Sequence, residues 1–148
     1  MAGEISILRK PQFGTPGTVK HAVTSGTTAS IKAGQLCLKT AGSAFVVAWD
    51  ASNTAKPVVG TDYLAGLAMS TSTETASAVG YVEVLPIVPG MVFLGDPKVA
   101  ATWDTQSEYD ALVGDRVLLD TTAAGIQSLL AADGATYGLI IEPLDLKA

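Results

Sequence analysis

The sequence predicts a single domain that consists mainly of β-strands, and three observations support this prediction. Short apolar runs recur between turns that contain glycine or proline, which is typical of strands. Only one segment has a helix start signal, and a similar order of turns and strands occurs twice. At 148 residues the chain has the size of one domain. A chain of this size buries roughly 70% of its unfolded surface, enough for a core without disulfides or metal.

Two stretches, residues 33–69 and 113–141, resemble each other at a constant offset. The aligned pairs are Gly34 with Gly114, Leu38 with Leu118, and Val46 with Ile126. Each unit has the order turn, strand, turn, strand, loop, strand, which is a building unit of small barrels and sandwiches. We expect the two glycines to occupy matching turns where a Cβ would be hindered, and the two leucines to face the core.

The N-terminal residues 1–26 have little periodicity, and Pro11 and Pro16 interrupt any regular element. We therefore divide the chain into an extended N-terminal arm, 1–26, and a single β domain, 27–148. The arm is expected to become ordered on a partner.

The β domain begins with apolar and polar residues in alternation. Leu36 and Leu38 would share one face of a strand, with Cys37 on the other. Gly66 lies inside a strand and indicates a bulge or a close approach of two backbones. The strands predicted from here onward cover residues 35–39, 45–49, 64–69, 80–85 and 91–94, followed by the second unit.

The one helix signal is a capping box at 105–108. Thr105 would accept a hydrogen bond from the Glu108 amide, and the Glu108 carboxylate would accept one from the Thr105 amide. Tyr109 and Leu112 then fall on one face, and Gly114 ends the helix after about two turns.

The charge is uneven along the chain, although the net charge is only −5. Residues 1–40 hold five basic residues and one glutamate, whereas residues 41–148 hold four basic and thirteen acidic residues. A basic arm on an acidic body favours contact with an acidic surface, although a solvated tail would have the same composition. An acidic body also argues against a nucleic-acid partner.

Targeting signals are not evident in the sequence. The start lacks a basic and apolar leader, and no run approaches the roughly 20 apolar residues of a membrane span. We expect a soluble protein made in the cytoplasm, with no membrane partner.

Catalytic chemistry is not indicated by any constellation of residues. The single histidine, His21, lies in the arm, where it would lack the rigid neighbours of a catalytic base. Cys37 is the only cysteine, so it can form neither an internal disulfide nor, with His21, a usual zinc site. The acidic residues of 104–120 lack calcium-loop spacing, and Gly14-Thr15-Pro16-Gly17 is no phosphate loop. We predict no catalytic residue, metal or cofactor.

The pattern of glycines and strands resembles the small capsid decoration (cement) proteins of tailed bacteriophages. The resemblance lies in the strand at 33–38, in Gly66-Leu67-Ala68, and in the strand at 81–86 before Pro89-Gly90, and it covers roughly residues 20–142. It implies a small β-barrel or β-tulip-like domain with one short helix and an extended N-terminal arm. It also implies homo-trimers that bind the major capsid protein on the outside of the virion head, without enzyme activity.

On this hypothesis the arm binds the capsid, and the residues expected to make contact are Arg9, Lys10, Phe13, Lys20 and His21. The basic side chains would attract the shell, and Phe13 would be an apolar anchor. Two alternatives remain open at this point: another virion β domain of the tail or fibre base, and a small ligand- or sugar-binding β module.

Overall fold

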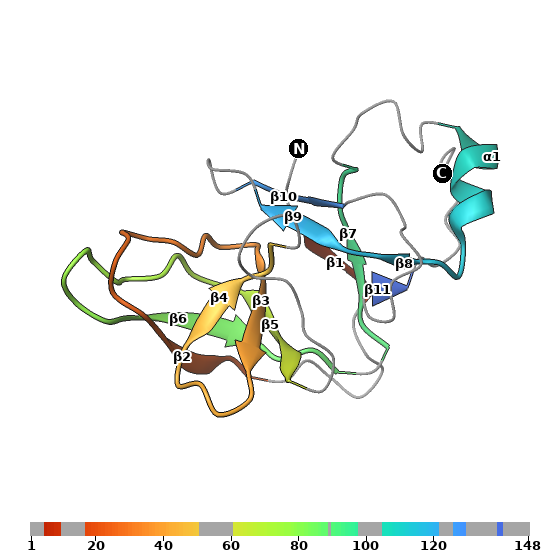
Figure 1. The fold of residues 1–148 in the computed structure, drawn as a ribbon. Coiled ribbons are helices and arrows are strands. Elements are labelled where there is room, and N and C mark those ends of the chain that lie inside the picture. The colour runs from red at the N-terminus through yellow and green to blue at the C-terminus, as the bar shows by residue number, and fades with distance from the viewer. Residues whose placement is uncertain are drawn as a thin grey trace.

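The structure is a computed structural model of the chain, shown in Figure 1, and it describes residues 5–9, 17–50, 61–88, 90–97, 105–121, 126–129 and 139–140. These residues form a mainly β fold with one short helix, as predicted. The elements are β1 (Ser6–Arg9), β2 (Val19–Val23), β3 (Leu36–Thr40), β4 (Val46–Ala48), β5 (Asp62–Ala68), β6 (Gly80–Leu85), β7 (Val92–Leu94), α1 (Gln106–Leu112), β8 (Arg116–Val117), β9 (Leu119–Thr121), β10 (Gln127–Leu129) and β11 (Leu139–Ile140).

The main sheet has five strands in the order β2-β6-β5-β3-β4, and all its neighbours are antiparallel. It curls so that its two edge strands approach each other, and a parallel bridge joins Ala22 to Phe45. Within the described part of the chain, β2 and β4 form no ladder beyond this bridge, so the sheet does not close into a barrel there.

Three two-stranded sheets lie beside the main sheet: β1 with β7, β9 with β10, and β8 with β11 (Figure 1). The first two are joined where Pro97 bridges Leu129 and the Leu129 amide donates to Asp96 O at 2.8 Å. In Figure 1 they lie toward the end of the molecule that carries α1, away from the loops that connect β2 to β3 and β5 to β6.

Each face of the main sheet contributes to a core of its own, because successive side chains of its strands point to opposite sides. The inner core fills the concave side of the curled sheet and contains Val23, Ile31, Cys37, Val46, Ala65, Ala68, Val82 and Val84. The outer core lies between the convex side and the smaller sheets, and it contains Ile5, Leu36, Leu38, Trp49, Leu67, Leu85 and Leu119.

The N-terminal residues differ from the extended arm that the sequence suggested. Val19–Val23 form β2, an edge strand of the main sheet that pairs with β6 over its whole length. Ser6–Arg9 pair with β7, and Ile5 is buried in the outer core. The strand β2 was missed because Lys20 and His21 interrupt its apolar pattern. Residues 1–26, which were predicted to be an arm outside the β domain, therefore contain two strands that belong to the fold.

The two glycine turns of the internal repeat match, as predicted. Gly34 and Gly114 have φ values of +87° and +91°, a backbone conformation that side chains with a Cβ rarely adopt. The Gln35 amide donates to Lys32 O at 3.2 Å, and at the same offset the Asp115 amide donates to Leu112 O at 2.9 Å. The two turns are thus equivalent in position, glycine conformation and hydrogen bonding.

The strand order of the two units also agrees, while the hairpin register differs. β3 pairs with β4 and β5, and the 116–121 segment pairs correspondingly with β10 and β11, always antiparallel. Leu38 pairs with Val47, whereas Gln127, the equivalent of Val47, pairs with Thr121. Leu38 is buried, and Leu118 lies half-buried against the same outer core. Among the described leucines of the second unit, the fully buried one is Leu119, the equivalent of Lys39.

Several local predictions are confirmed by the structure. The capping box of α1 has both reciprocal hydrogen bonds between Thr105 and Glu108. Gly66 lies at a bulge in the pairing of β3 with β5, and a Cβ added there would come within 2.1 Å of Leu85 O. Such a contact leaves no space for a side chain, so β5 and β6 can pack this closely only with glycine at this position.

Candidate interaction surface

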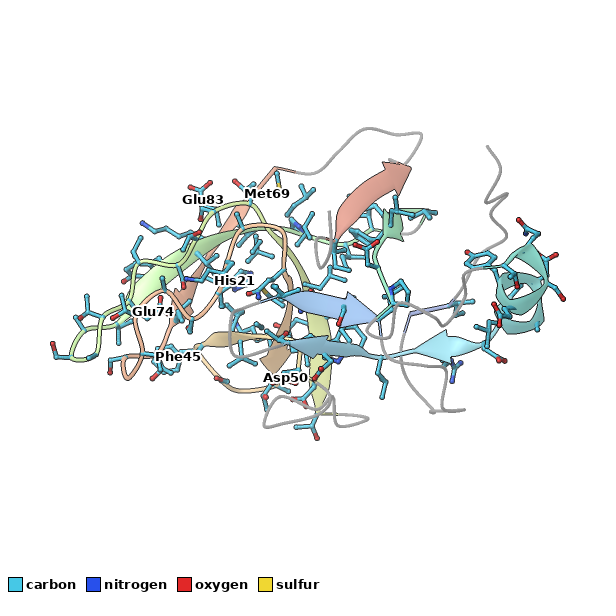
Figure 2. All side chains as sticks on the ribbon, turned by 90° about the horizontal axis from the view of Figure 1, so that it is seen from above. His21, Phe45, Asp50, Met69, Glu74 and Glu83 are labelled. Carbon is cyan, nitrogen blue, oxygen red and sulfur yellow. The ribbon has the colours of Figure 1, made fainter. Side chains whose placement is uncertain are left out.

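Part of the convex side of the main sheet is exposed, over β2 and β6. Directly paired residues of antiparallel strands share a face, and here Lys20 is paired with Glu83 and Ala22 with Tyr81. Met69 follows β5, donates its amide to Glu83 O at 2.7 Å, and lies beside Glu83 in Figure 2. Because successive side chains along a strand point to opposite faces, Val79, two residues before Tyr81, lies on the same face as Tyr81. The β2–β6 face, as we name this surface, consists of Lys20, Ala22, Met69, Val79, Tyr81 and Glu83.

Three large side chains of this face are about half exposed: Met69 at 51%, Val79 at 48% and Tyr81 at 47%. They lie together on one side of the sheet, whereas large apolar residues of a monomer surface are usually scattered singly. The β2–β6 face thus has the composition of a protein contact surface.

The two charged groups of the face are not engaged with each other. The Lys20 ammonium lies over the ring of Tyr81, 4.6 Å from its centre, and the Glu83 carboxylate accepts a hydrogen bond from Thr18 Oγ1 at 3.4 Å. A cation over an aromatic ring at an exposed site contributes about 0.5–1 kcal/mol. Both charges therefore remain available to a partner.

Of the five predicted arm residues the structure describes Arg9, Lys20 and His21, and these three do not lie on one face of one sheet. Lys20 and His21 are adjacent on β2, so their side chains point to opposite faces of the sheet, and Figure 2 shows His21 toward the middle of the domain. Arg9 is the last residue of β1, in a different sheet. Lys10 and Phe13 lie outside the described residues.

His21 is half-buried on the concave side, where partial burial lowers its pKa below the ordinary value. The positive charge of Lys39 lowers that pKa further. The imidazole is therefore neutral at pH 7, and it cannot attract an acidic surface by charge.

Cys37 and the acidic residues show no reactive arrangement. Cys37 is buried in the inner core, and burial raises its pKa to about 12, so the thiol stays protonated. Glu108 is used in the capping box of α1, as expected. Within the ranges that the structure describes, no three His, Cys, Asp or Glu side chains lie close enough to hold a metal ion.

A buried glutamate joins two loops at the end of the sheet opposite α1, and no sequence pattern indicated it. Glu74 lies in the loop before β6 and is 1% exposed. Its Oε1 accepts hydrogen bonds from the backbone amide and hydroxyl of Ser30, in the loop after β2. Ser72 connects the same loops, because its hydroxyl accepts from the Ile31 amide at 3.0 Å. These contacts make the two serine- and threonine-rich loops one braced unit.

The hydrogen bonds decide the charge state of Glu74. Burial alone would raise the pKa of this carboxyl, but the hydrogen bonds from Ser30 and Ser72 outweigh burial and hold the pKa below its usual value. Since the pKa is lowered by folding, the stabilisation is complete above the pKa of the unfolded chain and is lost as pH falls through the folded value.

We therefore expect Glu74→Gln to lower the free energy of unfolding by about 1–3 kcal/mol at pH 7, because one acceptor of charge-assisted bonds is lost. Urea unfolding at pH 7, 5 and 3.5 should show the wild type losing more stability on acidification than the variant. Asp115→Asn, at an exposed carboxylate after α1 and outside the β2–β6 face, is the matched control and should unfold like the wild type at pH 7. Parallel losses in wild type and Glu74→Gln would contradict the role of this carboxylate.

Comparisons with known proteins add no relative to this description. No protein-family model matches the chain, and neither a curated protein nor a solved structure matches it significantly. In the described part of the chain, no helix is both long and apolar enough to span a membrane.

Proposed function

We propose that this chain is a structural protein of a tailed-phage virion, a decoration protein that binds the outer surface of the head and stabilises the shell. The observation that supports this role best is a basic N-terminal stretch attached to the fold at both ends. No acidic residue occurs between Ile5 and Trp49, and five basic residues do. The strands β1 and β2, which flank residues 10–16 in the sequence, belong to two different sheets.

Such a segment suits attachment to an acidic shell. Charge attraction between exposed groups speeds docking and contributes at most about 1 kcal/mol per pair. Two attached ends reduce the conformational entropy that a short segment loses on binding. Arg9 and Lys10 would supply the charge and Phe13 an apolar anchor. Lys20, which is exposed on β2, would add to the same field, while the neutral His21 would not.

The fold fits the mechanical role in this proposal. A curled sheet whose edges meet at the Ala22–Phe45 bridge would act as a barrel-like module, the architecture that the resemblance implies. A protein that binds only the assembled, expanded head stabilises that form by mass action. The proposed role requires no cofactor and no catalytic group, and the proposed partner is the major capsid protein. Homo-trimers, which the resemblance implies, stay a prediction.

Binding to expanded heads of the same phage tests the proposal. Wild-type protein should co-sediment with the heads and bind less tightly as salt rises from about 50 to 300 mM, since exposed charges are screened. The double variant Arg9→Ala, Lys10→Ala should bind up to about 30-fold more weakly at low salt, at about 1 kcal/mol for each of two pairs, and lose most of the salt dependence. Lys98→Ala with Arg116→Ala removes the same charge outside this basic stretch and is the matched control.

Two results would count against the proposal. Heads that capture none of the wild-type protein would contradict the decoration role itself. Binding that is equally tight at low and high salt would contradict the role of Arg9 and Lys10 in docking.

A further inference from the structure

We propose that the β2–β6 face is a contact between two copies of this chain, related by a two-fold axis that runs between β2 and β6, parallel to both strands. The contact goes beyond head binding and concerns the free protein. The face is exposed over three large side chains, Met69, Val79 and Tyr81, and it is continuous with the convex side of the sheet that the outer core covers elsewhere.

Charge complementarity selects a second copy as the occupant. Lys20 and Glu83 are direct cross-strand neighbours on this face, one on each side of the proposed axis. A two-fold rotation exchanges the two strands, so each Lys20 would meet the partner's Glu83. Self-complementary pairing of this kind is the property of an isologous interface. A face with a lysine on one strand and a glutamate on the neighbouring strand is therefore complementary in charge to the same face of a second copy.

The sizes of the side chains support the same axis. Ala22 and Tyr81 are the next cross-strand pair, and they combine the smallest side chain of the face with its largest ring. The same rotation would place each Tyr81 over the partner's Ala22, where space exists for it. Two sheet faces packed in this way lie about 10 Å apart, a separation that aromatic side chains fill well.

Charge reversal gives a direct test in the isolated protein. Lys20→Glu and Glu83→Lys each place like charges across the axis, so each variant alone should dissociate by sedimentation at micromolar concentration. An equimolar mixture of the two variants should re-associate, because the carboxylate introduced at position 20 of one chain then meets the ammonium introduced at position 83 of the other. Lys32→Glu makes the same charge change at an exposed loop position and should associate like the wild type. Circular dichroism melting checks that every variant is folded.

Removal of the ring gives a second, independent measurement. Tyr81→Ala should weaken the association about tenfold or more, as for a buried aromatic residue of an interface. Tyr63→Ala truncates another tyrosine, 51% exposed on β5 and outside the face, and should have no such effect.

The number of copies decides the outcome. The two-fold contact predicts a species with an even number of 15.1-kDa chains that either charge reversal halves: a dimer, or a hexamer if threefold association exists as well. A monomer, a trimer, or a species that Lys20→Glu and Tyr81→Ala leave unchanged would overturn the contact. None of these results depends on binding to heads, so this inference and the proposed function can fail separately.

Discussion

Deletion of residues 1–26 should abolish the cooperative thermal unfolding transition, or lower the melting temperature by more than about 10 °C. The deletion removes β2, which pairs with β6 over five residues, and also removes Ile5 from the outer core. Val82 and Val84 of the inner core would lose the strand beside them. For a chain of this length a loss of about 1 kcal/mol lowers the melting temperature by about 2–4 °C, and a lost strand costs several times that.

Two substitutions within β2 test the contribution of this strand to stability separately from that of the other residues in 1–26. Val23 is 2% exposed and belongs to the inner core, whereas Val19, on the same strand, is 46% exposed. Val23→Ala should cost about 2 kcal/mol in urea unfolding, and Val19→Ala less than about 0.5 kcal/mol. A truncated protein that melts like the full chain, or equal effects of the two valine substitutions, would show that β2 is dispensable for the fold.

Signals confined to a few neighbouring residues were sufficient to predict much of the fold. The capping box of α1, the strand β6, the bulge at Gly66 and the matching turns at Gly34 and Gly114 each depend on residue type at fixed short spacing. Glycine at a position with positive φ is a local requirement of the turn, and it needs no knowledge of what packs against it. These predictions were confirmed for that reason.

Contacts between distant residues could not be predicted in the same way. The partner of Glu74 is Ser30, 44 positions earlier, and neither residue has a feature that marks it as buried. The β2–β6 face exists because Val19–Val23 pair with β6, and that register follows from the whole sheet. Two consecutive polar residues hid β2, because Lys20 lies on its exposed face and His21 is only half-buried on the other. The candidate surface was therefore accessible only after the strand pairing was known.

Gln127, which is fully buried in β10, makes most of the side-chain hydrogen bonds that attach the second repeat to the first. The Leu36 amide donates to its Oε1 at 2.7 Å, and its Nε2 donates to Leu36 O at 3.1 Å and to Trp49 O at 3.0 Å. The carboxamide thus acts like a peptide group of an added strand at the start of β3. Thr121 Oγ1 completes the contact by donating to Trp49 O at 2.8 Å.

Gln127→Ala should therefore lower the free energy of unfolding by about 3–5 kcal/mol, because it leaves a cavity and leaves the buried Leu36 amide without its acceptor, while the Trp49 carbonyl keeps the hydrogen bond from Thr121 Oγ1. Gln127→Met keeps an unbranched side chain of similar length but no hydrogen bond to Leu36, and should cost about 2–3 kcal/mol. The control is Gln106→Ala on α1, where an exposed hydrogen bond to Asp110 at 2.6 Å is lost at a cost of about 0.5 kcal/mol or less. Urea unfolding of the three variants gives the comparison. If Gln127→Ala costs no more than Gln106→Ala, the carboxamide does not hold the two repeats together, and their union rests on the apolar contacts of Leu118, Leu119 and Leu129 with the outer core.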